Sequence, residues 1–390
     1  MRPHSCSGCC VCGSYLNPSW LEEDAIFLND EKWEIRHGQR KVLFLDAKEL
    51  ESKYIDKDMA SIWTSFYRLI LYDFSKGEFT LTGIGQQFNT TFTAPKDAAK
   101  AFAGVPPRDR KDFTKIYDVA PDLSWWNGDL GDDYEKIDLR HLPIGIHMSC
   151  WKLAQWKLGP GVAENLELFI AIALRTTFGI ISGFRGEGNT WPFNIYEIVA
   201  MKNSSCAERG GDIISELWSR NLYELQDRVD YDPSRNPWTQ NIIDSSRRIK
   251  KQISFAQPLP QSMIPDLPLE IWFEILDFLD CKEVSNLGIA LQIAIPDRYW
   301  RSRAALNLIE IDEIAEEDLN WHYLCLKFEA VYATGEKFES RRYIVDILSN
   351  KIKPTYLQNL GKRDFPRLEE VMGECEDAIL RYLHRYDFLD

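Results

Sequence analysis

The segment that decides the fold of this chain runs from Asp266 to Leu306 and reads DLPLEIWFEILDFLDCKEVSNLGIALQIAIPDRYWRSRAAL. Pro268 suits the first turn of a helix, where its missing N–H would have no intrahelical partner, and Glu270 suits the positive end of the helix dipole. The apolar side chains of this helix are Ile271, Trp272, Ile275, Leu276, Phe278 and Leu279. So wide an apolar stripe on a short helix predicts an element that needs cover on more than one side.

Two further short helices are expected directly after the first. Asp280 and Glu283 have the spacing of a capping box, which predicts a second helix that carries Val284 and Leu287. A third helix is expected from Pro296 through Trp300 to Leu306. Because three short helices cannot bury all their large side chains among themselves, we expect an apolar surface that is left for a partner.

This ordered pattern resembles the F-box motif, with its Leu-Pro start, apolar ladder, aliphatic second helix and terminal Trp. The matching positions are Leu267, Pro268, Glu270, Ile271, Ile275, Leu279, Val284, Leu287 and Trp300. The segment departs from the common form at Cys281, where a proline often follows the Asp, and in the unusual IALQIAIPD before the third helix.

The resemblance implies a binding role for eight of these residues. They are Leu267, Pro268, Ile271, Ile275, Leu279, Val284, Leu287 and Trp300. F-box domains bind a Skp-type adaptor, which links them to a cullin and a RING subunit in SCF ubiquitin ligases. The chain would then be a substrate receptor for ubiquitin-dependent degradation that brings an unidentified protein close to the ligase and supplies no catalytic residues. Two alternatives are a scaffold that acts with the adaptor outside a ligase and a three-helix segment packed wholly within its own chain.

Outward from the F-box segment, the character of the chain changes on both sides. Residues 1–230 mix strand-like runs, such as RLILYDF at 68–74, with helix-like segments, and we expect an α+β domain there that recruits the substrate. Prolines and a basic run predict a linker at 231–261. The F-box is expected at 262–306 and a C-terminal helical region at 307–390. The predicted fold class is therefore α+β and multidomain.

Cysteine and histidine form two short pairs in the N-terminal region. Cys9 and Cys12 make a CxxC pair before Gly13, and His147 and Cys150 make an HxxC pair before Trp151. Such pairs can build a tetrahedral zinc site, although Cys6 and Cys10 are nearby substitutes as ligands. Alternatively, Cys150 is a small buried apolar residue and the N-terminal cysteines lie on a frayed tail.

A group of fungal F-box proteins resembles most of this chain, with a Cys-x-x-Cys-Gly segment first, then His-x-x-Cys-Trp, and the F-box late. This resemblance implies that Cys9, Cys12, His147 and Cys150 bind one structural zinc ion. A closed site of this kind holds a fold and does no chemistry, because it leaves no position for water. A zinc or thiol enzyme that uses His147 and Cys150 is the third reading, but no third group is evident to orient the histidine.

The net charge and the hydropathy of the chain argue against several other classes of protein. The chain has 46 Lys and Arg against 60 Asp and Glu, a formal net charge of −14, so we expect no nucleic-acid partner. The N-terminus lacks the apolar stretch of a signal peptide. The most apolar segment, 166–184, contains Glu167 and Arg175 and predicts a buried core element, not a membrane span. We therefore expect a protein of the cytoplasm, the nucleus or both.

Overall fold

The computed structural model of the chain describes residues 9–12, 43–50, 63–64, 66–73, 76–88, 91–103, 116–119, 141–182, 232–249 and 268–362, with five further positions between 365 and 371. The chain divides into two compact units. Unit 1 contains Met1–Pro233 and Tyr343–Asp390, and unit 2 contains Ser234–Arg342. Each unit is described below by itself, and unit 2 is inserted into the sequence of unit 1.

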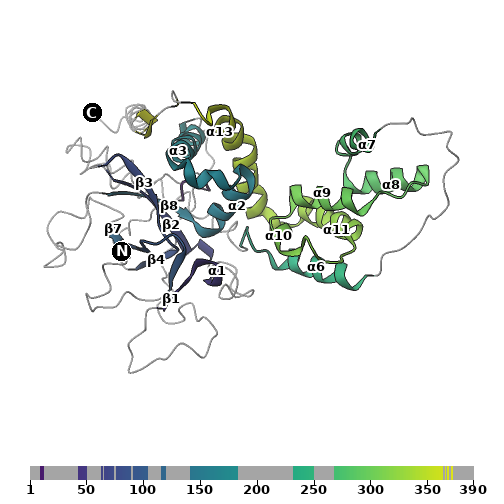
Figure 1. Cartoon of the computed structure of the whole chain (residues 1–390), viewed down its shortest axis with the longest axis horizontal. Helices are drawn as coiled ribbons and strands as arrows, with labels where there is room; N and C mark the ends of the chain where they lie inside the picture. The colour runs from purple at the N-terminus through teal and green to yellow at the C-terminus, as the bar shows by residue number, and fades with distance from the viewer. Residues whose placement is uncertain are drawn as a thin grey trace, which may run out of the picture. The chain divides into compact units, whose positions relative to one another are not determined.

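An antiparallel sheet forms the base of unit 1 (Figure 1). Its central strand is β2 (Phe66–Asp73), which pairs along its length with β8 (His141–His147) and, on the other edge, with β3 (Glu78–Leu81) and β4 (Gly85–Phe88). The sheet continues through β5 (Thr91–Pro95) to β7 (Ile116–Val119). A second, two-stranded sheet pairs β1 (Leu43–Asp46) with β6 (Lys100–Ala103). The near-continuous apolar run of β2 is buried on both faces, as a central strand requires.

The described helical elements of unit 1 are α1 (Ala47–Glu49), α2 (Met148–Leu158), a 3₁₀ helix (Pro160–Glu164), α3 (Leu166–Ser182), a π-helical segment (Ile347–Ile352) and α13 (Lys353–Asn359). Helix α2 contacts β2 and β8, α3 contacts β3, and α13 packs on both helices (Figure 1). The expected mixture of helix and sheet is therefore confirmed for this part of the chain.

The apolar segment at 166–184 was expected to be a core element, and its described side chains agree. Residues 168–174 of α3 are all buried. Among the residues that the structure describes, no helix combines the length and apolar character needed to span a membrane.

The elements of unit 2 among its described residues, 234–249 and 268–342, are all helices (Figure 1). Its elements are α6 (Pro237–Arg248), α7 (Leu269–Leu276), α8 (Cys281–Leu291), α9 (Asp297–Asn307), α10 (Ile311–Ile314), α11 (Trp321–Thr334) and a 3₁₀ helix (Glu336–Phe338). Helix α12 (Glu339–Asp346) contains the border between the units. The predicted capping box is present at α8, where the Asp280 side chain accepts from the Glu283 N–H and the Glu283 carboxylate accepts from the Asp280 N–H.

Helices outside the segment 266–306 supply much of the core of unit 2. Ile243 on α6 and Trp321 and Phe328 on α11 join one buried cluster with Val284 and Trp300. A buried ion pair between Arg341 and Glu310, 2.7 Å apart, lies in the same unit. The segment 266–306 is thus covered in large part by its own chain.

This arrangement changes the predicted domain boundaries. The segment 231–261, predicted as a linker, contains α6, because Asn236 caps a helix there and Ile242 and Ile243 bury themselves in unit 2. Residues 307–342, predicted to belong to a separate C-terminal region, are part of the same compact unit as α7–α9. The physical reason is the wide apolar stripe of the short helices, which α11 covers by packing on α8 and α9, while α6 packs on α11.

Candidate functional site

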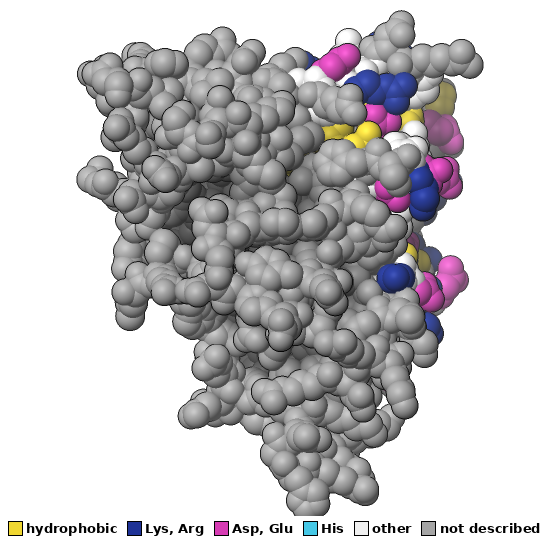
Figure 2. Space-filling model, turned by 90° about the vertical axis from the view of Figure 1, so that its left-hand side faces the viewer, with side chains coloured by type: hydrophobic (Ala, Val, Ile, Leu, Met, Phe, Trp, Pro, Cys, Tyr) yellow, Lys and Arg dark blue, Asp and Glu magenta, His cyan; other side chains and the backbone are white. Residues whose placement is uncertain are grey.

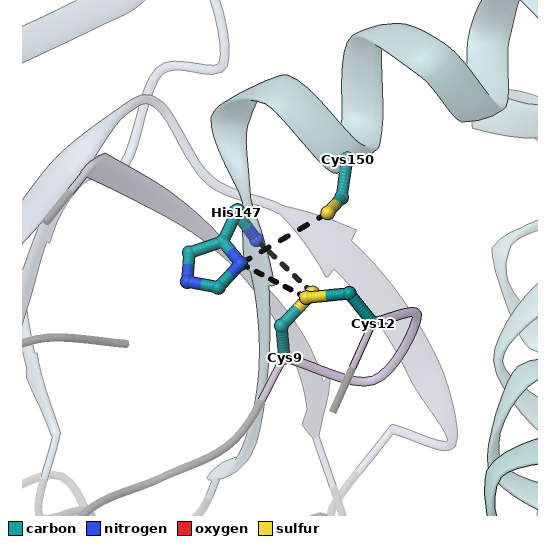
Figure 3. A group of neighbouring side chains, drawn as sticks. All are labelled: Cys9, Cys12, His147 and Cys150. Carbon is teal, nitrogen blue, oxygen red and sulfur yellow. Dashed lines mark hydrogen bonds between the residues drawn. The ribbon is translucent and has the colours of Figure 1, made fainter. Parts of the chain in front are cut away.

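A buried cluster of Cys9, Cys12, His147 and Cys150 is the candidate metal centre (Figure 3). His147 is the last residue of β8, and α2 begins at the next residue, so Cys150 lies in the first turn of that helix. The Cys9–Cys12 segment is held against β8, where the Cys10 N–H donates to the Gly145 carbonyl at 2.9 Å. The strand-to-helix junction and the N-terminal segment therefore bring the two sequence pairs together.

The distances within this cluster suit a single ion. One ligand atom from each residue lies within 4.8 Å of all the others. The ring nitrogen Nδ1 of His147 is 3.3 Å from Cys12 Sγ and 3.9 Å from Cys150 Sγ. The backbone N–H of His147 donates a hydrogen bond to Cys9 Sγ at 3.4 Å. Ligands of a tetrahedral zinc ion lie roughly 3.3 to 3.8 Å from one another, given Zn–S of about 2.3 Å and Zn–N of about 2.0 Å. A small contraction would close the cluster around a metal.

The electrostatics of the cluster also favour binding of a cation. Burial raises the pKa of the Cys9 thiol, but hydrogen bonds from Cys12 and Cys150 and the charge of His147 outweigh it and hold this pKa well below its usual value. Burial opposes protonation of His147, yet the charges of Cys12 and Cys9 raise its pKa to about 10. The pocket therefore gathers three sulfurs around one imidazole, a set of ligand atoms that could hold a metal ion.

The structure distinguishes between the ligand choices that the sequence left open. Cys10 is fully buried but does not belong to the cluster, and its thiol pKa is raised by burial first and then by Cys9 and Cys12. Cys6 lies outside the described residues. A frayed tail does not describe Cys9 and Cys12, which are 0% and 3% exposed. The four residues predicted from the sequence are therefore the four that converge.

The surroundings of the cluster are closed and rigidly connected. The Trp63 ring meets the His147 ring edge-on, with centroids 4.9 Å apart. Ser149, which lies between the two ligands on the chain, donates to the buried Asp232 carboxylate at 2.7 Å. Cys150 is itself fully buried, so a substrate has no direct approach to its thiol. This geometry favours a structural site over a thiol nucleophile.

The predicted adaptor-binding residues that the structure describes divide into three groups, which are exposed, half-buried and fully buried. Pro268, Ile271 and Ile275 lie at the surface, the two isoleucines 40% and 41% exposed. Leu279 and Leu287 are half-buried and pack against the core of unit 2. Leu267 lies outside the described residues.

Val284 and Trp300 require a correction. Both were assigned to adaptor contact, but they are 0% and 2% exposed and belong to the core of unit 2. The reason is that α11 packs on α8 and α9 and covers this side of the segment. Their role in the described unit is to hold the helices together.

Two exposed apolar side chains were not assigned to the site from the sequence. Phe278 is 90% exposed, and Ile289 on α8 is 58% exposed. Ile271 and Ile275 are one helical turn apart on α7, and Phe278 lies in the turn two residues after the end of that helix. We call Ile271, Ile275 and Phe278 the α7 row. The acidic residues Glu270, Glu274 and Asp277 are exposed next to its members along the chain.

Charged side chains of both signs occur together elsewhere on the surface. On the face drawn in Figure 2, the described Lys and Arg side chains lie among Asp and Glu side chains. The chain matches no protein-family model, and no curated protein or solved structure is significantly similar to it.

Proposed function

We propose that this chain is a non-catalytic substrate receptor of an SCF ubiquitin ligase. In this proposal α7 and the adjacent part of α8 bind a Skp-type adaptor, and through it a cullin and a RING subunit. Unit 1 then presents a protein target whose identity is unknown. The observation that carries the proposal is the exposed α7 row, located within the segment that has the F-box pattern.

The row is exposed even though the other side of α7 is packed. Leu276 is 2% exposed within the core of unit 2, and Phe273 packs against the same core and against the Tyr299 ring, with centroids 5.1 Å apart. The described helices of unit 2 therefore use one side of α7 and leave the other to solvent. Clusters of exposed apolar side chains with a polar border are typical of protein-binding sites.

The border of this site also suits a protein partner. Glu270, Glu274 and Asp277 lie beside the row, and their negative charge would speed the approach of a partner with basic residues at the matching positions and add little to affinity at physiological salt. Such a surface holds two proteins together and offers no nucleophile or general base. Its contribution to ubiquitylation is to keep a target near the charged E2 enzyme.

For unit 1 we propose a structural zinc ion bound by Cys9, Cys12, His147 and Cys150. Three thiolates and one imidazole fill all four positions of a tetrahedral site, so the metal would stabilise the fold and leave no position for water. His147 would bind through Nδ1, which is the ring nitrogen that faces the sulfurs. The ion would tie the N-terminal segment to the junction of β8 and α2.

Co-purification with a Skp-type adaptor and a cullin tests the ligase proposal. The native chain is expected to retain both, and an Ile271→Ala/Ile275→Ala variant is expected to lose both while remaining folded by circular dichroism. The matched control is Leu357→Ala/Leu360→Ala on α13 of unit 1 and just after it, because these side chains are similarly exposed, at 51% and 45%. Retention of the adaptor by the isoleucine variant would overturn the proposal.

The same experiment separates the alternatives. A chain that retains the adaptor but no cullin is a scaffold that acts outside a ligase. If the chain retains neither the adaptor nor the cullin, the three helices serve only as an internal core of the chain. In that case, labelling of thiols together with metal analysis would test the zinc or thiol enzyme, since a catalytic Cys150 would react while the other three ligands stayed bound.

A further inference from the structure

Two charged side chains meet at the junction between α7 and α8, although neither belongs to these helices. Arg303 comes from α9 and Glu329 from α11, and their side chains are only 9% and 31% exposed. The distance from Arg303 Nη2 to Glu329 Oε1 is 3.1 Å. Because removing such a pair from water costs desolvation energy, the further hydrogen bonds of each partner decide what it contributes.

Arg303 binds the backbone where α7 ends. Its guanidinium donates to the Leu276 carbonyl at 3.3 Å and to the Leu279 carbonyl at 2.5 Å, and Asp277 Oδ1 is 3.9 Å away. Leu276 is the last residue of α7, and the last carbonyls of a helix lack an i+4 partner within it. The positive charge also suits the negative end of the helix dipole. Arg303 therefore fixes the C-terminal end of α7.

Glu329 binds the backbone where α8 begins. Its second carboxylate oxygen, Oε2, accepts a hydrogen bond from the backbone N–H of Cys281, the first residue of α8. The first N–H groups of a helix have no intrahelical acceptor, and a negative charge suits this positive end. The Arg303–Glu329 pair thus joins the end of α7 to the start of α8.

The turn between these two helix ends carries one member of the α7 row. Phe278 lies in this turn, and its side chain is 90% exposed. Since so exposed a side chain has little packing to fix it, its direction depends on the backbone of the turn. A side chain that is held in place before binding loses less conformational entropy when a partner covers it.

We propose that Arg303 and Glu329 are positioning residues for the adaptor surface, because their ion pair holds the turn between α7 and α8 in the conformation that presents the α7 row. This inference rests on the proposed function, since it concerns the same surface. Neither residue has to touch the adaptor. Loss of the pair would leave the apolar side chains of the row present but the turn free to move.

Hydrogen exchange of the full chain without the adaptor tests the hold on the turn. In Arg303→Met, the amides of residues 277–281 are expected to exchange about tenfold faster than in the native chain, as measured by mass spectrometry. Arg342→Met is the matched control, because Arg342 also donates to two backbone carbonyls at a helix end, those of Tyr332 and Gly335 at the end of α11. It should leave exchange at 277–281 unchanged.

Titration calorimetry with a purified Skp-type adaptor tests the link to binding. The Kd of Arg303→Met is expected to rise about tenfold, because the adaptor must then order the turn. In the complex, exchange at 277–281 is expected to return to the native rate. A purely structural role would lower the melting temperature and leave both readings at the native value, as expected for Arg342→Met.

Glu329→Gln provides a second test if Arg303→Met does not fold, since glutamine keeps the shape of the side chain and removes its charge. It should show the same changes, whereas Glu317→Gln, which removes the more exposed pair of Glu317 with Arg247, should show none. Unchanged exchange at 277–281, an unchanged Kd despite faster exchange, or equal effects in the controls would overturn the inference. A native chain that does not bind the adaptor would instead overturn the proposed function and, with it, the role of the pair, even where the free variants exchange faster.

Discussion

The replacement Phe278→Ala tests the adaptor surface with little effect on the fold. Phe278 is 90% exposed, so its removal should change the free energy of unfolding by less than about 0.5 kcal/mol. Complete burial of a phenylalanine side chain is worth about 1.5 to 3 kcal/mol. If the adaptor covers the nine-tenths that is now exposed, the variant should lose about 1.4 to 2.7 kcal/mol of binding free energy. At about 1.4 kcal/mol for each factor of ten, Kd should rise about 10- to 100-fold.

Isothermal titration calorimetry with a purified Skp-type adaptor measures this change, and urea unfolding of each variant alone measures stability. Leu357→Ala is the matched control, because this leucine is 51% exposed on α13 of unit 1 and is not part of the proposed site. Its Kd should equal that of the native chain. A Phe278→Ala variant that binds the adaptor within about twofold of the native Kd would refute the assignment of the α7 row as the contact surface.

Three further predictions concern metal content and stability. Cys12→Ser should lose the bound metal, measured by inductively coupled plasma mass spectrometry, and should melt at a lower temperature. Cys10→Ala should retain the metal, because Cys10 is outside the ligand cluster. Equal metal content in the two variants would contradict the proposed site. Val284→Ala should lower the free energy of urea unfolding by about 2 kcal/mol, because Val284 is fully buried, and an unchanged midpoint would mean that unit 2 is not packed as described. Burial, and then the charge of Lys353, lower the pKa of Lys157 to about 8 from its ordinary value of 10.5. Between these two values the unfolded chain holds more protons, so the free energy of unfolding should rise with pH there, and the rise should be smaller in Lys157→Met; equal slopes would refute this assignment.

The local features of α7, α8 and α9 were readable from the sequence because they depend on neighbours along the chain. The Asp280–Glu283 capping box and the start of α9 at Pro296 follow from side chains within one turn of the backbone groups that they satisfy. The helix start at Pro268 was placed within one residue, since Pro268 caps α7 and Leu269 begins it. The α+β character of the N-terminal part followed in the same way from short apolar runs such as that of β2.

Contacts between residues far apart along the chain could be predicted from the sequence only in part. The metal ligands were predicted as two pairs, but periodicity does not predict a contact between Cys12 and His147, which are 135 residues apart in the sequence. The pairing of β8 with β2 and the hydrogen bond of Cys10 to Gly145 bring the two pairs together. The spacing alone also left Cys10 open as a ligand. Its exclusion needed the distances of the folded chain.

The sequence by itself therefore determined that short helices with more apolar surface than they can bury follow one another from Pro268 to Leu306, and that two Cys/His pairs are available for a metal. Only the tertiary structure decided which apolar side chains are covered. Val284 and Trp300 carry the same hydrophobic signal as Ile271 and Ile275, yet the first two are buried and the last two exposed. The physical reason is that burial depends on what packs against a helix, and here that cover comes from α11, which packs on α8 and α9 and lies outside residues 266–306 in the sequence.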